Sequence, residues 1–573
     1  MMKRLITISL VLLLMIGLSS MQAFAKAKIT IVNNNAAGVG FNDPTPVTPV
    51  GGNPGTTLGK QRLNAFTEAA RIWGDTLDSP VEITILASFV PLTCTASSAT
   101  LGSSGTTEIF RDFPGLSLLA PGAEYAGTWY HFSLANKLAG VNLDPATPNM
   151  QARFNSNLGN PGCLTGSFWY LGYDTNTPVG QINLITVLLH EFAHGLGFSQ
   201  FASVTNGSLI GGFPDVYNRQ IFDNTLQTTW DQMTNAQRVT SAINPRRVTF
   251  IGPQVSDAVP GVLSFGVPQL QVFTPAAIAG RYEVGTASFG PALTSTGISG
   301  QIVLATDASN ASGPSTTDAC TTILNPTDIA GKIALVDRGT CTFNIKAANL
   351  QGAGAIAMIV ADNAAGGPPA GLGGTDSTIT IPAVRITQAD GNLIKSQLGA
   401  GVTATLSLDL SIRAGADVNG KALLYTPNPV VQGSTISHFD TIDFPNQLME
   451  PNINADLTHN VKPPYDMTLP LLRDVGWYPD ADGDGLADAS DACVSSDLTA
   501  GNILLGKCNT TVSNMLFTNG CTIRDHVQQA GTGVNNHGGW VSNMAHLGES
   551  LVSAGVITDA QKDAMQSCAA RYK

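Results

Sequence analysis

The length and charge of this chain limit which class of protein it can belong to. Its 573 residues exceed what one hydrophobic core normally organises, so we expect about two to four domains. The formal net charge of −12 argues against a nucleic-acid-binding protein, because contacts to phosphates require clustered Lys and Arg. Only 12% of residues are charged, and Gly (60) and Pro (32) are frequent, which favours a loop-rich globular protein over a disordered one.

The N-terminal segment has the pattern of a secretory signal peptide. Lys3 and Arg4 precede an apolar run, and residues 23–25 (Ala-Phe-Ala) form a small-x-small cleavage site. We therefore predict a secreted, extracellular protein that loses residues 1–25 and has no stable membrane anchor. The alternative is a retained anchor, but the apolar run is short for a membrane span.

The eight cysteines are expected to form disulfides, because thiols of exported proteins are normally oxidised. Connectivity does not follow from sequence alone, so each cysteine is paired with its neighbour along the chain. This working assignment predicts the bridges Cys94–Cys163, Cys320–Cys341, Cys493–Cys508 and Cys521–Cys568.

Strands and helices are expected to alternate in the N-terminal half. Residues 60–77 place Leu63, Phe66, Ala70 and Trp73 on one side of a helix. Residues 81–89 (VEITILASF) alternate between apolar and polar side chains, as a half-buried strand does.

Residues 188–200 (LLHEFAHGLGFSQ) carry the clearest chemical motif. Histidines four residues apart face the same side of a helix, so His190 and His194 can bind one zinc ion through their imidazole nitrogens. Glu191 can then act as general base on a water at that metal. The alternative is an ordinary helix, but the chain has only eight histidines, which makes coincidence a weak explanation.

The ends of this helix are also predicted. Thr177-Pro178 is typical of a helix start, because proline is preset for the first turn. Gly197 is expected to end the helix in a left-handed turn that redirects the chain.

The motif HEFAHGLGF resembles that of the metzincin clan of zinc proteases. Most members have a third histidine where this chain has Gln200, and the neutral amide of glutamine is a poor zinc ligand. The leishmanolysin-like branch instead places this histidine far downstream, before a methionine turn, and residues 437–451 (SHFDTIDFPNQLMEP) are similar to that segment. The resemblance implies that His438 is the third ligand and that Met449 forms an apolar floor beneath the metal. By analogy, residues 150–159 are expected to form an edge strand that pairs with an extended substrate.

Several alternatives remain open for the third ligand. In one alternative, His438 belongs to a loop without metal; His459 is the runner-up ligand, and His131 a more distant one. In a gluzincin-type enzyme a downstream glutamate such as Glu283 would be the ligand, although Glu283 lies within an inserted module.

The inserted module is predicted between residues 268 and 413, where strands and short helices alternate with Gly-rich turns. Residues 331–362 resemble the protease-associated (PA) domain, and this resemblance agrees with a Cys320–Cys341 bridge. The module is either a substrate-selecting flap or a passive spacer.

An aspartate-rich loop and a small tail close the chain. Oxygen ligands at EF-hand-type spacing predict a calcium site. The loop also resembles thrombospondin type 3 repeats. The predicted ligands are Asp480, Asp482, Asp484, Leu486, Asp488 and Asp491. An acidic linker is the alternative. The tail is expected to be a small helical domain rather than a second metal site built from its histidines, His526, His537 and His546.

Together these patterns predict an α+β fold. A metzincin-like catalytic domain, with a twisted mixed sheet, an active-site helix and a C-terminal subdomain, is interrupted by an α/β PA domain. The predicted parts are a signal peptide (1–25), a metallopeptidase domain (26–267 and 414–479), the PA domain (268–413), a calcium loop (480–493) and a Cys-containing helical tail (494–573). The predicted function is a secreted zinc endopeptidase acting on peptides or proteins. The alternative is a non-catalytic extracellular binding protein.

Overall fold

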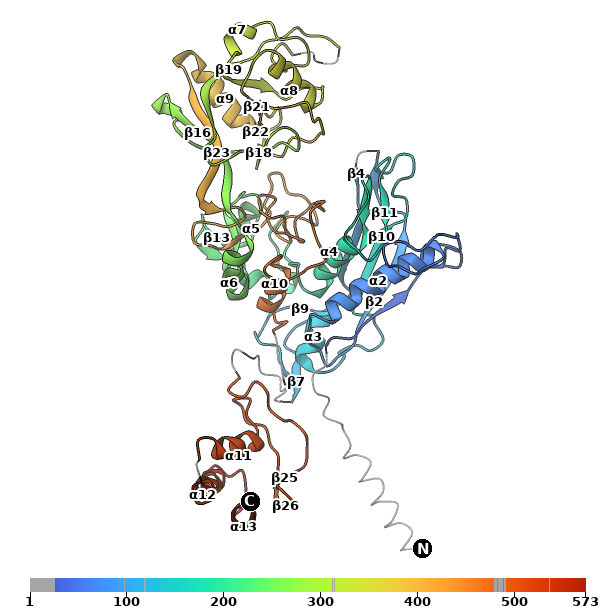
Figure 1. Ribbon diagram of the computed structural model, residues 1–573, viewed down its shortest axis with the longest axis vertical. Coiled ribbons are helices and arrows are strands. Elements are labelled where there is room, and N and C mark those ends of the chain that lie inside the picture. The colour runs from blue at the N-terminus through green and yellow to red at the C-terminus, as the bar shows by residue number, and fades with distance from the viewer. Residues whose placement is uncertain are drawn as a thin grey trace. The chain divides into compact units, whose positions relative to one another are not determined.

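Figure 1 shows the computed structural model of the chain. The structure describes residues 26–572 except 97, 118–119, 312, 314, 479–481, 483–487, 489–490 and 535, so the predicted signal peptide lies outside the described residues. The chain divides into two compact units, one holding the described residues up to Gly197 and from Val475 on, the other Phe198–Asp474. None of the helices in these described ranges is long and apolar enough to cross a membrane.

The first unit contains a four-stranded mixed sheet. Its order is β1 (Ile29–Asn33), β2 (Ile83–Val90), β10 (Met150–Asn155) and β5 (Gly102–Thr106), with only β5 antiparallel to its neighbour. The edge strand beside β10 is therefore β5, and the prediction that residues 150–159 form the edge is wrong. Alternating polarity reports that one face of a strand is buried, but not whether its backbone is paired on both sides.

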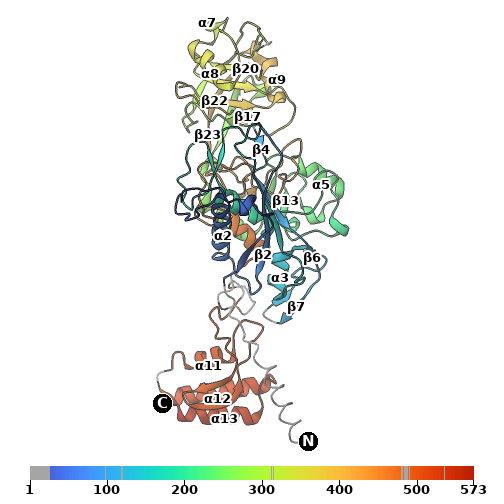
Figure 2. The ribbon, with the colours of Figure 1, turned by 90° about the vertical axis from the view of Figure 1, so that its right-hand side faces the viewer.

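Helices α2 (Leu58–Gly74) and α4 (Leu184–Leu196) pack against each other beside this sheet (Figure 1). Figure 2 shows α2 and β2 from a second side. The Phe66 ring of α2 lies at the centre of their interface, with centroids 4.9 Å from Phe154 and 6.1 Å from Phe192 in edge-on contacts. The indole N–H of Trp73 donates to the carbonyl of Leu189 at 3.1 Å. These contacts fix how far α4 is rotated and displaced relative to the sheet.

Shorter elements complete this part of the first unit. Helix α3 (Phe132–Ala139) is almost wholly buried, and the Cys94–Cys163 bridge is present as predicted. The remaining strands form four small pairs: β3 (Cys94–Thr95) with β4 (Ser98–Ala99), β6 (Ile109–Phe110) with β9 (Tyr130–His131), β7 (Pro114–Ser117) with β8 (Ala120–Gly122), and β11 (Phe168–Tyr170) with β12 (Gln181–Asn183).

The second unit begins with a small antiparallel sheet and three helices. The sheet order is β14 (Thr228–Thr229), β13 (Ile221–Asp223), β15 (Val248–Phe250) and β24 (Ala422–Leu423). The helices are α5 (Asn235–Ala242), α6 (Pro253–Val262) and α10 (Thr468–Asp474). The Asp474 carboxylate accepts hydrogen bonds of 2.9 Å from the N–H groups of Gln254 and Val255, so α10 caps the first turn of α6.

An eight-stranded sheet organises residues 265–413 of the second unit. Its order is β17 (Gly280–Glu283), β16 (Phe265–Thr274), β23 (Thr403–Arg413), β19 (Ile298–Leu304), β20 (Ile333–Asp337), β21 (Ala357–Ala361), β22 (Ala383–Ile386) and β18 (Gly285–Thr286). Its helices are α7 (Pro326–Ile329), α8 (Phe343–Gly352) and α9 (Gln388–Gln397). Strands β19 to β22 are parallel, as expected of an α/β module. The long strands β16 and β23 pair from Phe265↔Arg413 onward, so the chain enters and leaves the module at adjacent points, as an inserted domain requires.

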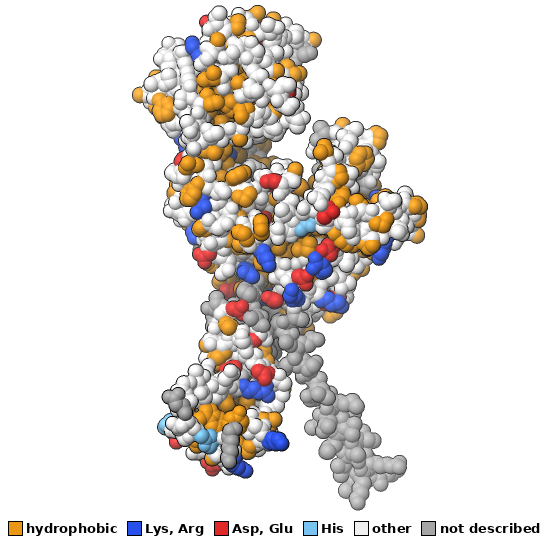
Figure 3. Space-filling model, viewed as in Figure 1, with side chains coloured by type: hydrophobic (Ala, Val, Ile, Leu, Met, Phe, Trp, Pro, Cys, Tyr) orange, Lys and Arg blue, Asp and Glu red, His pale blue; other side chains and the backbone are white. Residues whose placement is uncertain are grey.

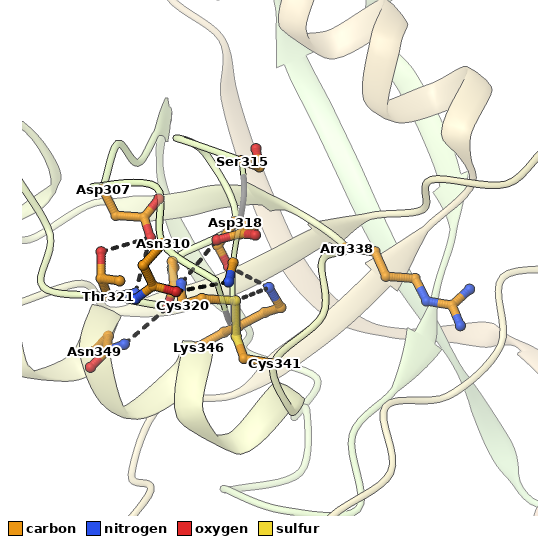
Figure 4. Close-up of a disulfide and its surroundings, with 12 residues drawn as sticks. Asp307, Asn310, Ser315, Asp318, Cys320, Thr321, Arg338, Cys341, Lys346 and Asn349 are labelled. Carbon is orange, nitrogen blue, oxygen red and sulfur yellow. Dashed lines mark hydrogen bonds between the residues drawn. A yellow bond between two sulfur atoms is a disulfide. The ribbon is translucent and has the colours of Figure 1, made fainter.

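The predicted Cys320–Cys341 bridge is present in this module (Figure 4). The fully buried Lys346 of α8 donates to the carbonyl of Asp318 and to Cys320 Sγ, 3.4 Å away. Asn349, one turn further on, donates to the carbonyl of Ala319 at 2.9 Å. The bridged loop is therefore held on α8 by hydrogen bonds as well as by the disulfide.

The tail combines a hairpin, β25 (Asn502–Leu505) and β26 (Cys508–Ser513), with helices α11 (Ile523–Gly531), α12 (His537–Ser553) and α13 (Asp559–Arg571). The predicted pairings Cys493–Cys508 and Cys521–Cys568 are wrong, because the bridges are Cys493–Cys521 and Cys508–Cys568. Packing decides this: α13 lies against β26, and the Ala492 N–H donates to the Asn519 carbonyl, which brings Cys493 beside Cys521.

Charged side chains are distributed sparsely over the surface. On the face shown in Figure 3, Lys and Arg side chains stand singly or in small groups among Asp and Glu. The negative net charge is therefore not concentrated in one acidic area of this face.

Truncation of Phe66 should destabilise the first unit. We expect Phe66→Ala to lower the free energy of unfolding by about 3–5 kcal/mol, because it leaves a cavity among rings that cannot collapse onto it. Urea unfolding followed by tryptophan fluorescence measures the change. The matched control is Phe168→Ala, whose ring is 52% exposed; an equal loss there would contradict this account of the core.

Candidate metal centre and active site

The ends of helix α4 set the position of the histidine motif. The helix starts at Leu184, where the Asn183 side chain accepts hydrogen bonds from the N–H groups of Ile185 (3.0 Å) and Thr186 (3.3 Å). The predicted start at Thr177-Pro178 is wrong, because residues 181–183 pair with β11 first. The predicted end is confirmed: Gly197 has φ +138°, and its N–H donates to the carbonyls of Ala193 and His194.

One turn of α4 brings two imidazoles together. The Nε2 atoms of His190 and His194 are 3.2 Å apart. Two nitrogens on a tetrahedral zinc ion are separated by about 3.3 Å, given Zn–N bonds of about 2.0–2.1 Å. The pair therefore has the spacing of two ligands on one ion.

Glu191 lies between these histidines and is itself buried. Burial raises the pKa of its carboxyl to about 8, while an N–H hydrogen bond from the backbone of Ser104 in β5 acts in the opposite direction. A Cβ at Gly102 would lie 3.1 Å from Glu191 Cγ, so β5 runs directly behind this side chain. The edge strand and the general-base candidate are thus neighbours.

His438, in the second unit, has one ring nitrogen in a hydrogen bond to the backbone. Its side chain is buried, and Nδ1 lies 2.9 Å from the carbonyl oxygen of Ser434. A carbonyl only accepts, so Nδ1 carries the proton and Nε2 has the lone pair that a metal requires. The N–H of Phe439 donates to the carbonyl of Met449 at 2.9 Å, which joins the histidine loop to the fully buried methionine.

The backbone just before His438 is strained. Ile436 has φ +71°, a conformation that β-branched residues rarely adopt and that costs of order 1–3 kcal/mol. Tyr217, fully buried, donates from its hydroxyl to the Ile436 carbonyl at 3.1 Å, and the Ile436 N–H donates to the Tyr425 carbonyl at 2.8 Å. These bonds hold the turn that positions His438, and no pattern in the sequence predicts them.

One group of potential metal ligands appears among the described residues. In the first unit it comprises His190 and His194, whose Nε2 atoms share one side of α4; the third ligand that the motif implies, His438, belongs to the second unit. The alternative ligands are outside this group. His131 is fully buried, and burial, with a smaller contribution from His194, lowers its pKa to about 3. The Glu283 carboxylate is 3.2 Å from the guanidinium of Arg246.

Two other predicted site residues have defined surroundings. The N–H of Gln200, which stands where most metzincins have their third histidine, donates to Ser437 Oγ at 3.4 Å. His459 does not belong to the metal-ligand group of the described chain.

The predicted calcium loop is only partly described. Asp480, Asp484 and Leu486 lie outside the described residues. Asp482 accepts a hydrogen bond of 2.6 Å from the Ser496 N–H, and Asp491 accepts one of 2.7 Å from the Cys493 N–H. Calcium binding by this loop, with Asp488 as a further ligand, stays a prediction.

Comparison with known proteins identifies one module. Residues 298–394 match the PA domain family. The predicted PA resemblance is thereby confirmed for this part of the chain.

The PA-containing chain has relatives of different activities. The probable leucine aminopeptidase 2 of Aspergillus fumigatus is 35% identical over 136 residues, which are 23% of this chain and 26% of that protein. The minor extracellular protease Vpr of Bacillus subtilis is 37% identical over 92 residues, 16% of this chain and 11% of that protein. The human ER degradation-enhancing alpha-mannosidase-like protein 3 is 39% identical over 83 residues, 13% of this chain and 9% of that protein.

A solved structure, BSAP, a zinc aminopeptidase from Bacillus subtilis, is 25% identical over 27% of this chain and 36% of its own, with a TM-score of 0.19. This chain spans about a quarter of the length of the Aspergillus relative and about a tenth of the other two. The relatives are named as two peptidases and a mannosidase-like protein. Their similarity therefore establishes the PA module but not the activity of this chain.

Removal of the Tyr217 hydroxyl should loosen the His438 turn. We expect Tyr217→Phe to lower the free energy of unfolding of the second unit by about 1–3 kcal/mol, because the buried Ile436 carbonyl loses its hydroxyl donor. Denaturant unfolding measures this loss. The control is Tyr465→Phe, whose side chain is 58% exposed and which should change stability little.

Asp215 should make the stability of the second unit depend on pH. Its buried carboxyl accepts hydrogen bonds from the N–H groups of Phe201 (2.6 Å) and Asn218 (2.7 Å), yet burial raises its pKa to about 7. The folded state therefore holds a proton that the unfolded chain releases near pH 3.8, and wild-type stability falls as pH rises from about 4 to about 7. Asp215→Asn should show a smaller fall over this interval in denaturant unfolding; identical slopes would refute the assignment.

Proposed function

We propose that this chain is a secreted zinc-dependent endopeptidase of metzincin-like type. His190, His194 and His438 would hold the zinc ion, and Glu191 would act as general base. The observation that carries the proposal is the 3.2 Å spacing of the His190 and His194 Nε2 atoms beside a buried glutamate. In the second unit, the buried His438 has its Nδ1 on the Ser434 carbonyl, as a third ligand binding through Nε2 would.

The donor set fits zinc better than the other common biological cations. Imidazole nitrogens suit zinc, whereas calcium and magnesium prefer oxygen. Three protein ligands leave a position for water or substrate, which distinguishes a catalytic zinc site from a structural one. When bound, zinc polarises the scissile carbonyl and makes a coordinated water more acidic.

Glu191 would move the proton. Its carboxylate would accept a proton from the attacking water. It then donates the proton to the leaving amine as the peptide C–N bond breaks. A structural zinc site needs no general base, so a buried glutamate between the two histidines favours a catalytic site.

The edge strand β5 would bind the substrate backbone. A hollow lies along it, lined by residues 103–107 together with Gln151 and Arg153. An extended peptide can add to such an edge through main-chain hydrogen bonds, with weak demands on side chains. This mode suits cleavage within a chain, whereas an aminopeptidase needs a group that captures the substrate amine.

Other features agree with this proposal. Four disulfides are typical of an exported protein, and two relatives are named as an aminopeptidase and an extracellular protease. The PA module would act as a flap or as a spacer, and the aspartate loop would take calcium.

Peptide cleavage by site variants tests the mechanism. We expect Glu191→Gln to lower kcat/KM by about 10²–10⁴-fold while retaining one zinc per chain, because it removes the base but no ligand. His438→Ala should lose both zinc and activity, whereas the matched variant His459→Ala should keep both. Zinc content is measured by atomic emission and activity with a quenched fluorescent peptide library.

The opposite pattern would support the rival function. A Glu191→Gln variant that cleaves as fast as wild type would remove the hydrolytic mechanism. A wild-type chain that binds zinc but cleaves no peptide would point to a non-catalytic binding protein.

A further inference from the structure

Four carboxylates are buried together in the second unit, on the segment that follows His438. Their side chains belong to residues that are at most 4% exposed: Asp440, Asp443, Glu450 and Asp466. The other three carboxylates lie close enough to Asp443 for their negative charges to repel its own. Burying several such groups is costly unless hydrogen bonds, a proton or a cation compensates them.

Three of these carboxylates have backbone or amide donors. Glu450 accepts from the Gln447 N–H at 2.7 Å and from the Asn454 side chain at 3.0 Å. Asp466 accepts from the N–H groups of Leu448 and Thr468, both at 2.7 Å. Asp440 accepts through Oδ1 only, from the Ile442 N–H at 3.1 Å.

Asp443 differs from its neighbours. Neither of its carboxylate oxygens has a hydrogen-bond donor within the described chain, and Oδ2 of Asp440 has none either. The nearby cation is Arg246, which is 3.9 Å from Asp440 and is shared with Glu283 at 3.2 Å. One shared guanidinium leaves most of the negative charge of this cluster uncompensated.

The backbone is shaped to bring Asp443 into this position. A Cβ on Gly415 would lie 2.2 Å from Asp443 Oδ1, and Gly415 has φ +93°. Only glycine fits, because a side chain would both strain the backbone and occupy the space of the carboxylate. Gly415 follows β23, the strand by which the chain leaves the eight-stranded sheet.

We propose that Asp443 and Glu450 are ligands of a hard divalent cation, Ca²⁺, in addition to the zinc ligands and the aspartate loop. Carboxylate oxygens are the ligands that Ca²⁺ prefers, and its flexible coordination accepts backbone carbonyls and water as the remainder. No three carboxylates of the described cluster bring oxygens within 4.8 Å of one another, so the ion takes two directly. The free Oδ2 of Asp440 adds charge close by.

The competing occupant is a proton. Burial and the neighbouring Glu450 raise the pKa of Asp443 well above its usual range, and burial raises that of Glu450 to about 8. A protonated pair would need no metal. The two occupants differ in their response to Ca²⁺ and to pH, which makes them separable.

Bound Ca²⁺ would stiffen the segment that carries His438 and Met449. It would join Asp443, five residues after the histidine, to Glu450, directly after the methionine. The same ion would anchor this segment beside Gly415.

The test measures Ca²⁺ binding by a variant in which Asp480→Asn, Asp482→Asn and Asp484→Asn remove carboxylates from the aspartate loop; this variant is the loop-silenced chain. One equivalent of zinc is present throughout. Equilibrium dialysis against radioactive Ca²⁺ should give one ion per chain. Adding Asp443→Asn should lose that ion, whereas Asp215→Asn, a buried carboxyl elsewhere in the unit, should keep it. Zinc content reports the proposed catalytic site separately.

Two results would overturn the proposal. The first is that the loop-silenced chain binds no Ca²⁺. This measurement needs no Asp443 variant, so it stands even if that variant fails to fold. The other is a melting temperature of the loop-silenced chain that falls from pH 6 to pH 9 and is insensitive to Ca²⁺, which identifies a shared proton.

Discussion

The rest of the site depends on the burial of helix α4. Trp73 and Trp477 donate from their indoles to the carbonyls of Leu189 and Leu196, at 3.1 Å and 2.7 Å, so the helix is fastened near its middle and at its last residue. Between them one turn carries His190 and His194. Because both rings belong to α4, a rotation of the helix would move them together with Glu191 relative to β5, and the two indole hydrogen bonds oppose such a rotation.

The histidine beyond the insertion is controlled by backbone rather than by helix geometry. A strained turn at Ile436, the carbonyl of Ser434 and the contact with Met449 together decide how His438 is presented. The inserted module leaves this arrangement intact because β16 and β23 run side by side and return the chain close to where it left.

Burial of carboxyl groups recurs in this molecule with different consequences. Glu191 is enclosed beside two imidazoles, and burial raises its pKa. Asp215 accepts hydrogen bonds from backbone N–H groups, yet burial still raises its pKa to about 7. Asp443 has no donor within the described chain, and a cation is the remaining way to keep it charged.

The sequence by itself determined what depends on local geometry: the pairing of His190 with His194 four residues later, the turn at Gly197, and the α/β character of the inserted module. No pattern in the sequence predicts that the acidic residues at 440, 443 and 450 are buried. Tertiary structure alone decided that these are buried, that β5 and not β10 is the edge strand, that Asn183 starts the helix, and that Cys508 pairs with Cys568. These features depend on which distant segments pack together, and side-chain periodicity along the chain carries no information about that choice.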